Sequence, residues 1–204
     1  QSIRKSQISN IEYRIVNVSE ITADRHSGRC PESAPTNATE YKPDAGQASM
    51  TGFEKDFYRI WKQTGSRGDF WVPPFNEYVN EVSAFSGKGF FVLSYLENKH
   101  LVSGCLILIC DSIAYYHHAA STTEGQNLHS PYGQMWQAIL GAKKRGCAKM
   151  DLEGIFDPRF KEMFKKWLNF SAFKLKWGGE VYEYPGSFTK SYNPLIGLLF
   201  RLGN

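Results

Sequence analysis

Hydrophobic positions between residues 53 and 85 recur at the spacing of helices. In the first half of this stretch, apolar side chains repeat every three or four residues, which is typical of an amphipathic helix with one buried face. Glycines at positions 65 and 68 can end that helix, and Asn76, after a pair of prolines, can cap a second helix that continues to about Phe85. The first stripe consists of Phe53, Phe57, Ile60 and Trp61. We therefore predict two consecutive helices.

The next apolar runs predict strands. Residues 89–96, 100–110 and 112–120 are separated by short polar turns, a pattern typical of an antiparallel meander. Residues 11–18 alternate apolar and polar side chains and predict a further strand near the start of the chain.

Helices and short strands alternate in the second half of the chain. Ser130 and Pro131 can begin a helix with one apolar face, and Gly146 can end it. The pattern then predicts a strand at 149–152, a helix at 160–173, a strand at 180–184 and an apolar helix at 194–202. Helices on both sides of a meander indicate an α/β fold with a mixed sheet.

Composition divides the 204 residues into three parts. Residues 1–18 contain only a short strand pattern before a different composition begins. Residues 19–52 contain three prolines and few large apolar side chains, so we expect a loop-like, mobile insertion. Residues 53–204 carry the pattern of a folded domain. The chain begins with Gln1 rather than Met, so we expect a processed chain or a fragment.

The charge of the chain is small but unevenly placed. The net charge is +4, whereas the stretch 143–190 alone has eleven lysines and arginines against six acidic residues, or about +5. This half favours an anionic partner. The four cysteines contain no CxxC pair and the chain has no phosphate-binding glycine motif, so neither a zinc site nor a nucleotide cofactor is predicted.

An acidic segment follows the predicted strand at 149–152. Asp151 and Glu153 flank a turn that ends at Gly154, and carboxylates so placed can line the mouth of a cleft. The alternative is a solvated turn in which Gly154 supplies unusual backbone dihedrals. Both interpretations stay open from the spacing alone.

A second candidate site combines aromatic and basic residues before two glycines. Phe173, Lys174, Lys176 and Trp177 lie within five positions, which suits a hairpin whose aromatic rings stack on a base while a lysine neutralises a phosphate. The alternative is a basic turn whose aromatic rings face the core.

Two histidines, a residue type that binds metal ions, lie next to each other in the third predicted strand. Neighbouring residues of a regular strand point to opposite faces, so His117 and His118 are not expected to share one ion, and no metal site is predicted. Tyr116, on the same strand, is predicted to contact substrate. No Ser/His/Asp triad can be assembled.

The residues from Tyr115 to Gly186 resemble the C-terminal GNAT-type domain of the Fem (FemABX) aminoacyltransferases, which build peptidoglycan interpeptide bridges. The resemblance is carried by YYHHAAS, SPYGQMWQAILGAKKRGC, DLEGIFDPRF and FKLKWGGEVYEYPGSF, in the family order and spacing. The opening IRKSQISNIEYRIV is similar to the segment that joins the first Fem domain to the second, so the resemblance implies that residues 1–18 are the end of a preceding domain or a linking strand. The resemblance implies a GNAT-like, largely antiparallel sheet flanked by helices.

The resemblance also implies an activity. Fem enzymes transfer an amino acid from aminoacyl-tRNA to an amine on the stem peptide of a lipid- or nucleotide-linked cell-wall precursor. The family Phe-Lys pair matches Phe173 and Lys174, with the lysine offsetting negative charge near the ester or a tRNA phosphate. No cofactor is implied, and the expected setting is the cytoplasm, at the inner face of the membrane. A complete member has an N-terminal GNAT-like domain as well, so an isolated second domain is expected to be inactive.

Two other functions remain open at this point. The first is an acyl-CoA-dependent N-acyltransferase on the same fold, although no [QR]xxGx[GA] pyrophosphate loop begins a helix here. The second is a non-catalytic domain that binds the precursor or RNA.

Overall fold

Five strands form a single sheet in the order β1-β2-β3-β4-β5. The computed structural model describes residues 11–18, 52–96, 100–160 and 165–185, with 190 and 192. Neighbouring strands are antiparallel from β1 to β4, and β4 and β5 are parallel. The strands are β1 Glu12–Asn17, β2 Gly89–Tyr95, β3 Leu101–Cys110, β4 Ile113–Ser121 and β5 Lys149–Asp151.

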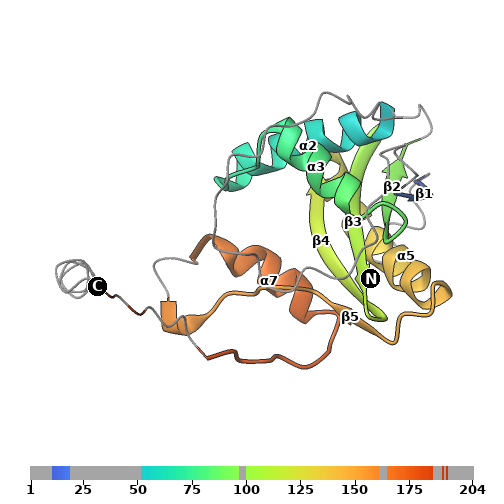
Figure 1. Ribbon diagram of the computed structural model, residues 1–204. Coiled ribbons are helices and arrows are strands. Elements are labelled where there is room, and N and C mark those ends of the chain that lie inside the picture. Colours follow the sequence, from blue (N-terminus) through green and yellow to red (C-terminus); the bar gives the residue numbers. More distant parts are fainter. Residues whose placement is uncertain are drawn as a thin grey trace.

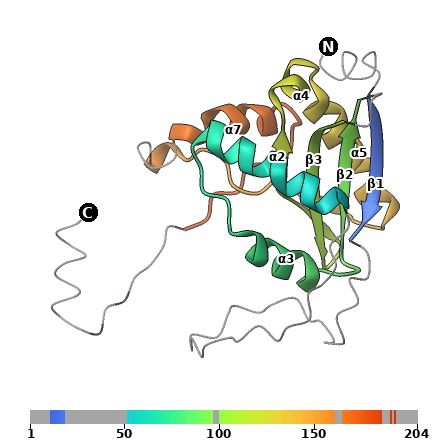
Figure 2. The ribbon, with the colours of Figure 1, turned by 90° about the horizontal axis from the view of Figure 1, so that it is seen from above.

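Helices cover both faces of the sheet, because alternate residues of its central strands supply two separate cores. Helices α2 (Gly52–Gly68) and α3 (Phe75–Ala84) lie on one face, and α5 (Ser130–Lys144) lies on the other (Figures 1 and 2). In β2, Phe91 and Leu93 pack in the core under α2 and α3, whereas Phe90 and Val92 pack in the core under α5.

The predicted fold class is confirmed, as are both early helices, the meander, the strand at 11–18 and the helix that begins at Ser130. β1 pairs with β2, so this early strand is part of the same sheet as the rest of the domain. One helix was missed: the short α4, Thr123–Asn127, is capped by the Thr122 side chain, which accepts a hydrogen bond from the Gly125 amide.

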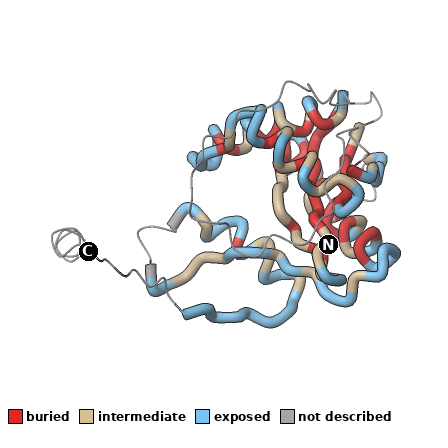
Figure 3. The backbone as a smooth tube through the Cα atoms, viewed as in Figure 1, coloured by how far each residue is buried: buried red, intermediate tan, exposed pale blue. Residues whose placement is uncertain are grey.

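The region after β5 differs from two predictions. Of the predicted helix at 160–173, residues 161–164 lie outside the described residues, and the described part forms the 3-10 turns Pro158–Phe160 and Lys165–Trp167 and the α-helix α7, Leu168–Leu175. Residues 180–184 are not a strand, because no neighbouring segment of the described chain pairs with them. Figure 3 shows the result: buried residues concentrate in the central strands β2 to β4 and on one face of α2, α3 and α5, whereas the chain after β5 is mostly exposed.

Some predictions fall on other parts of the chain. The predicted insertion, apart from Gly52 at the start of α2, and the predicted helix at 194–202 lie outside the described residues. No helix within the described ranges has both the length and the apolar character needed to cross a bilayer.

Candidate functional site

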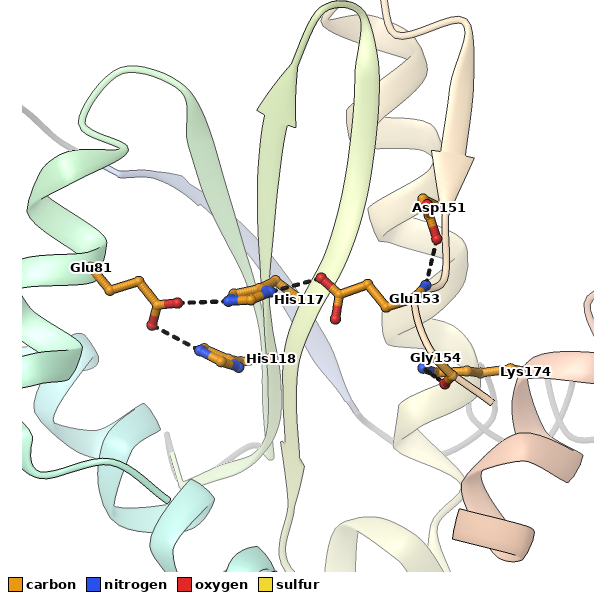
Figure 4. Close-up of polar contacts among 7 residues, drawn as sticks. All are labelled: Glu81, His117, His118, Asp151, Glu153, Gly154 and Lys174. Atoms are coloured by element: carbon orange, nitrogen blue, oxygen red, sulfur yellow. Dashed lines mark hydrogen bonds and ion pairs between the residues drawn. The ribbon is translucent and has the colours of Figure 1, made fainter. Parts of the chain in front are cut away.

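The candidate site lies where β4 and β5 separate. The two strands pair over three residues only, and the last pair is Tyr115 with Asp151. Beyond it, the Asp151 carboxylate accepts a hydrogen bond of 2.6 Å from the Glu153 amide, which closes a tight turn. Glu153 has a φ of 59°, in the left-handed region, and its side chain points back toward β4 (Figure 4). Asp151 therefore shapes the turn that presents Glu153.

Gly154 is required by close packing in this turn. A Cβ atom at position 154 would lie 2.8 Å from the Trp167 ring, too close for a real side chain. The positive φ belongs to Glu153 and not to Gly154, so the expectation that Gly154 supplies the unusual dihedrals is wrong. The glycine instead lets Trp167 approach the loop that leaves β5.

A β-bulge in β4 brings the two histidines to the same face. Leu106 pairs with His118 and Ile107 pairs with Tyr116, so His117 is an extra residue between two registered pairs. One extra residue moves every later side chain of the strand to the opposite face of the sheet from the one that regular alternation predicts. The cores show this reversal: Tyr116 packs on the α5 side, whereas Ala120 packs on the α2 and α3 side.

Both imidazoles therefore face α3, and the prediction that they point apart is wrong. Glu81 of α3 contacts His117 Nε2 with one carboxylate oxygen at 2.6 Å and His118 Nε2 with the other at 2.8 Å. The second ring nitrogen of His117, Nδ1, lies 2.7 Å from the Glu153 carboxylate. Trp61 of α2 packs against His118, with ring centroids 4.0 Å apart. We call Glu81, His117, His118 and Glu153 the acid–histidine cluster.

The hydrogen bonds of this cluster determine its charges. Burial alone raises the pKa of Glu81, but the hydrogen bonds from His117 and His118 lower it to about 2. Burial lowers the pKa of His117, but the hydrogen bonds to Glu153 and Glu81 raise it to about 9. His117 is therefore an imidazolium held between two carboxylates at neutral pH.

Lys174 lies on the other side of the same turn. It is in the last turn of α7, so the predicted aromatic-lysine hairpin is instead a helix end. Its ammonium donates a 2.8 Å hydrogen bond to the Gly154 carbonyl oxygen and lies 5.3 Å from the centroid of the Phe170 ring. Burial lowers the pKa of Lys174 below its ordinary value, and the nearby Glu153 and Asp151 carboxylates oppose this shift.

Aromatic rings support this end of α7. Phe173 makes an edge contact with Tyr132 of α5, with centroids 5.0 Å apart, and Trp177 lies 6.3 Å from both rings. Phe173 and Trp177 pack against the core on the α5 side, and the Trp177 ring nitrogen is buried with no hydrogen-bond partner among the described residues. Lys176 is exposed and donates a hydrogen bond of 3.2 Å to the Tyr132 hydroxyl. We call Phe173, Lys174, Lys176, Trp177 and Tyr132 the lysine–aromatic cluster.

The structure brings most of the predicted site residues to one edge of the sheet. Asp151, Glu153 and Lys174 meet around Gly154, and Phe173, Lys176 and Trp177 gather on Tyr132. Tyr116 is placed differently: it is 5% exposed, packs in the core on the α5 side, and its hydroxyl accepts a hydrogen bond from Gln134.

Sequence reasoning missed Glu81, which lies on a helix outside the quoted motifs. It also missed Tyr132, which lies within the quoted segment SPYGQMWQAILGAKKRGC but was not chosen as a site residue. The bulge left one trace in the sequence: Tyr115 to Ala120 shows no regular alternation across the two histidines.

Solved structures share this fold. The crystal structure of FemX is similar with a TM-score of 0.61 and 14% identity over 87% of this chain, and the match spans 52% of the FemX chain. An aminoglycoside acetyltransferase from an uncultured soil metagenomic sample, solved with sisomicin, gives a TM-score of 0.52 and 11% identity over 89% of this chain and 97% of its own. A GNAT-family acetyltransferase from Staphylococcus aureus Mu50 is similar with a TM-score of 0.52 and 12% identity. The match covers 71% of this chain and 90% of the acetyltransferase.

Sequence comparison identifies the family. No curated protein sequence matches the chain significantly. A sequence model of the FemAB family, however, matches residues 91–202, which span β2 to α7 and include Lys174 and both histidines. The chain covers about half the length of FemX, so it corresponds to part of that protein. Since the family match covers more than half of its 204 residues, the chain belongs to the FemAB family and has the fold of the GNAT acetyltransferases.

Proposed function

We propose that this domain takes part in aminoacyl transfer from aminoacyl-tRNA to an amine of a peptidoglycan precursor, with Lys174 as its catalytic residue. The observation that carries the proposal is the state of this lysine. Its ammonium is half-buried and donates to one neutral carbonyl, and among the described residues no carboxylate lies within ion-pair distance of it. A lysine has three N–H donors, so two of them remain for a substrate oxygen.

The chemistry of the reaction requires such a charge. The acceptor amine forms a C–N bond to the ester carbonyl carbon, the carbonyl oxygen becomes negative, and the C–O bond to the tRNA ribose then breaks. The amine loses a proton and the ribose oxygen gains one. An ammonium held in a partly dehydrated position stabilises the negative oxygen, or a phosphate beside it, more strongly than an ammonium in water does. The depressed pKa of Lys174 reflects that dehydration.

The aromatic part of the site has a supporting role in this proposal. Phe173 and Trp177 hold the end of α7 against Tyr132, and they position the lysine between them. Lys176, which is exposed, offers a second positive charge for a phosphate of the tRNA end. We propose Asp151 and Glu153 as the acidic border of the site, where an acceptor ammonium group is attracted before it loses its proton.

The proposal implies partners beyond this chain. They are an aminoacyl-tRNA, a lipid- or nucleotide-linked precursor peptide, and an N-terminal GNAT-like domain that completes the precursor site. Such a precursor places the reaction in the cytoplasm, at the inner face of the membrane.

Geometry disfavours acyl-CoA as the donor. A pyrophosphate needs free backbone amides at a helix N-terminus. Helix α5 begins after His129, which makes no side-chain cap, and Pro131 in its first turn has no N–H to offer. The Tyr132 amide is already bonded to the His129 carbonyl. The start of α5 therefore presents few donors to a phosphate.

A binding experiment tests the donor and the lysine together. An acceptor-stem minihelix carrying an amide-linked amino acid, which cannot react, is titrated against the chain, and acyl-CoA is titrated in parallel. Lys174→Met removes the charge and keeps the length of the side chain. Lys62→Met makes the same change at an exposed position of α2 and serves as the control.

We expect the wild type and Lys62→Met to bind the minihelix equally, and Lys174→Met to bind it at least tenfold more weakly. Tight binding of acyl-CoA with no binding of the minihelix would reject the proposal. Equal binding of the minihelix by all three proteins would remove Lys174 from it.

A further inference from the structure

The acid–histidine cluster contains three groups that metal ions prefer. One oxygen of Glu81 and one nitrogen each of His117 and His118 all lie within 4.8 Å of one another. The groups come from helix α3 and from the bulge of β4, so two elements that pack in the core of the domain hold all three. We propose that Glu81, His117 and His118 form a binding site for a divalent transition metal ion, with Zn²⁺ as the best match.

The ligand types determine the class of metal. Two imidazoles and one carboxylate form a set that binds Zn²⁺ in catalytic sites, where a fourth position stays open for water or a substrate oxygen. Imidazole nitrogens also disfavour Mg²⁺ and Ca²⁺, which require oxygen ligands. The proposed site therefore takes a transition metal and not a hard cation.

Glu153 supplies the outer contact that a histidine ligand needs. Histidines that bind a metal through one nitrogen usually donate the other N–H to a carboxylate, which orients the ring and strengthens the metal bond. His117 has this arrangement: Nδ1 lies 2.7 Å from Glu153, and Nε2 points toward Glu81 and His118. Figure 4 shows Glu153 on the far side of His117 from Glu81.

The cluster is open on one side. The side chains of Glu81 and His117 are 28% and 27% exposed, and that of His118 is 16% exposed. Trp61 packs against His118 and closes the apolar side. An ion can thus enter from solvent, and a fourth ligand can reach it.

A bound ion replaces the protons that now join the three groups. The carboxylate–imidazole contacts of 2.6 and 2.8 Å are hydrogen bonds. In a tetrahedral site with bonds near 2.0–2.2 Å the donor atoms lie about 3.4 Å apart, so the two Glu81–histidine contacts would lengthen by roughly 0.6–0.8 Å, which side-chain rotations can supply. Imidazole binds a metal ion in its unprotonated form, so metal binding releases protons and should strengthen as the pH rises.

The experiment uses the chain itself with the metal alone. Protein freed of metal with a chelator is titrated with ZnCl₂ by calorimetry at pH 7 and 8, and with CoCl₂ while the visible absorption of tetrahedral Co²⁺ is recorded. The variants are Glu81→Gln and His118→Ala at the ligands and Glu153→Gln at the outer contact. His100→Ala, at an exposed histidine outside the cluster, is the control. Circular dichroism and melting curves show whether each variant folds.

We expect one Zn²⁺ per chain and a tetrahedral Co²⁺ spectrum in the wild type and in His100→Ala. Each ligand variant should bind Zn²⁺ more than 100-fold more weakly, and Glu153→Gln should bind it 10- to 100-fold more weakly. Because His118→Ala removes a packed ring, the isosteric Glu81→Gln decides the result if the histidine variant does not fold. No binding by the wild type, or equal affinity in the wild type and Glu81→Gln, would overturn the proposal.

Discussion

The turn from Asp151 to Gly154 separates two regions with opposite electrostatic character. On one side, the groups of the acid–histidine cluster are bonded to each other: Glu81 joins both histidines, and His117 also joins Glu153. On the other side, Lys174 of the lysine–aromatic cluster is bonded only to a backbone carbonyl, among the described contacts. In the first region one imidazolium lies between two carboxylates, whereas in the second the Lys174 ammonium has no carboxylate within ion-pair distance among the described residues.

This difference shows why the two regions call for different experiments. In the acid–histidine cluster, removal of one partner leaves others partly buried and unpaired, so stability and metal binding should respond. In the lysine–aromatic cluster, removal of the lysine charge leaves no partner ion behind, so function should respond more than stability.

The largest expected effect is on transfer. In the full-length gene product, Lys174→Met should lower the rate of aminoacyl transfer by about 10²-fold or more, the usual consequence of losing one preorganised charge contact. Lys174→Arg keeps the charge and should retain part of the rate. The measurement is amide formation from aminoacyl-tRNA, with Lys62→Met as the control. An unchanged rate in purified, folded Lys174→Met would contradict the account.

The next effect tests the turn that joins the two regions. Gly154→Val places a side chain against the Trp167 ring, where a Cβ alone would already lie 2.8 Å away. We expect a loss of about 1–3 kcal/mol in the free energy of unfolding, as in other overpacked sites. Urea unfolding measures it, and Gly52→Val, where nothing lies within 4 Å of the added Cβ, is the control. Equal stability of both variants would show that Trp167 can move away from position 154 without loss of stability.

A smaller effect concerns pH, in chelator to exclude metal. The pKa of His117 is raised from 6.5 to about 9, so its ion pair stabilises the fold below pH 6.5 and loses this contribution as the pH rises through 9. Glu81, whose pKa falls from 4.5 to about 2, contributes above pH 4.5 and loses its contribution as the pH falls toward 2. The wild type should thus exceed Glu81→Gln in stability most clearly between pH 4.5 and 6.5.

Melting curves test this expectation. We expect a difference in Tm of about 2–4 °C near pH 6, which corresponds to 1 kcal/mol in a chain of this size, and a decrease of that difference by pH 9. Glu77→Gln, an exposed change on the same helix α3, should show no such trend. A difference in Tm that grows from pH 6 to pH 9 would contradict the expectation that the His117–Glu81 ion pair loses its stabilising effect as the pH rises.

The smallest effect concerns the salt dependence of RNA binding. The stretch 143–190 carries the excess positive charge, and only a few of its lysines can reach one tRNA end. The slope of log affinity against log salt concentration should therefore correspond to roughly two to four phosphate contacts. Lys176→Met should reduce that slope by about one contact and weaken binding at low salt only modestly. A titration of the minihelix at several salt concentrations measures it. An identical slope in wild type and variant would exclude Lys176 from the contact.

The sequence predicted the sheet better than the site, for a physical reason. Strands β2 to β4 and helix α2 bury their apolar residues, so the spacing of Phe57 and Trp61, and the runs that contain Phe91 and Leu106, report directly on the fold. The short turns between these strands leave an antiparallel meander as the natural arrangement.

The region after β5 gave a weaker signal because it buries little. Leu168 and Leu175, at the two ends of α7, are 48% and 56% exposed, so their spacing does not mark a buried face. Phe173 and Lys174 were predicted to lie in a hairpin, and the structure places them in the last turn of a helix. Residues 180–184 have the composition of a strand, but a strand needs a partner that composition cannot reveal.

The bulge at His117 shows a second kind of limit. A single extra residue reverses the facing of the rest of β4, and its position depends on the pairing with β3. Glu81 lies 36 residues before His117, so only the folded chain brings the two together. The absence of a metal site was predicted from regular alternation, and the bulge removes that premise.

The choice of donor tests the central claim most directly. Purified full-length gene product is incubated with a precursor peptide and either charged tRNA or acyl-CoA, and the peptide is analysed by mass spectrometry. The account predicts that the peptide gains one amino-acid residue from the charged tRNA, that the gain is lost with Lys174→Met and kept with Lys62→Met, and that acyl-CoA adds nothing. Acylation of the peptide by acyl-CoA, with none from charged tRNA, would contradict the account.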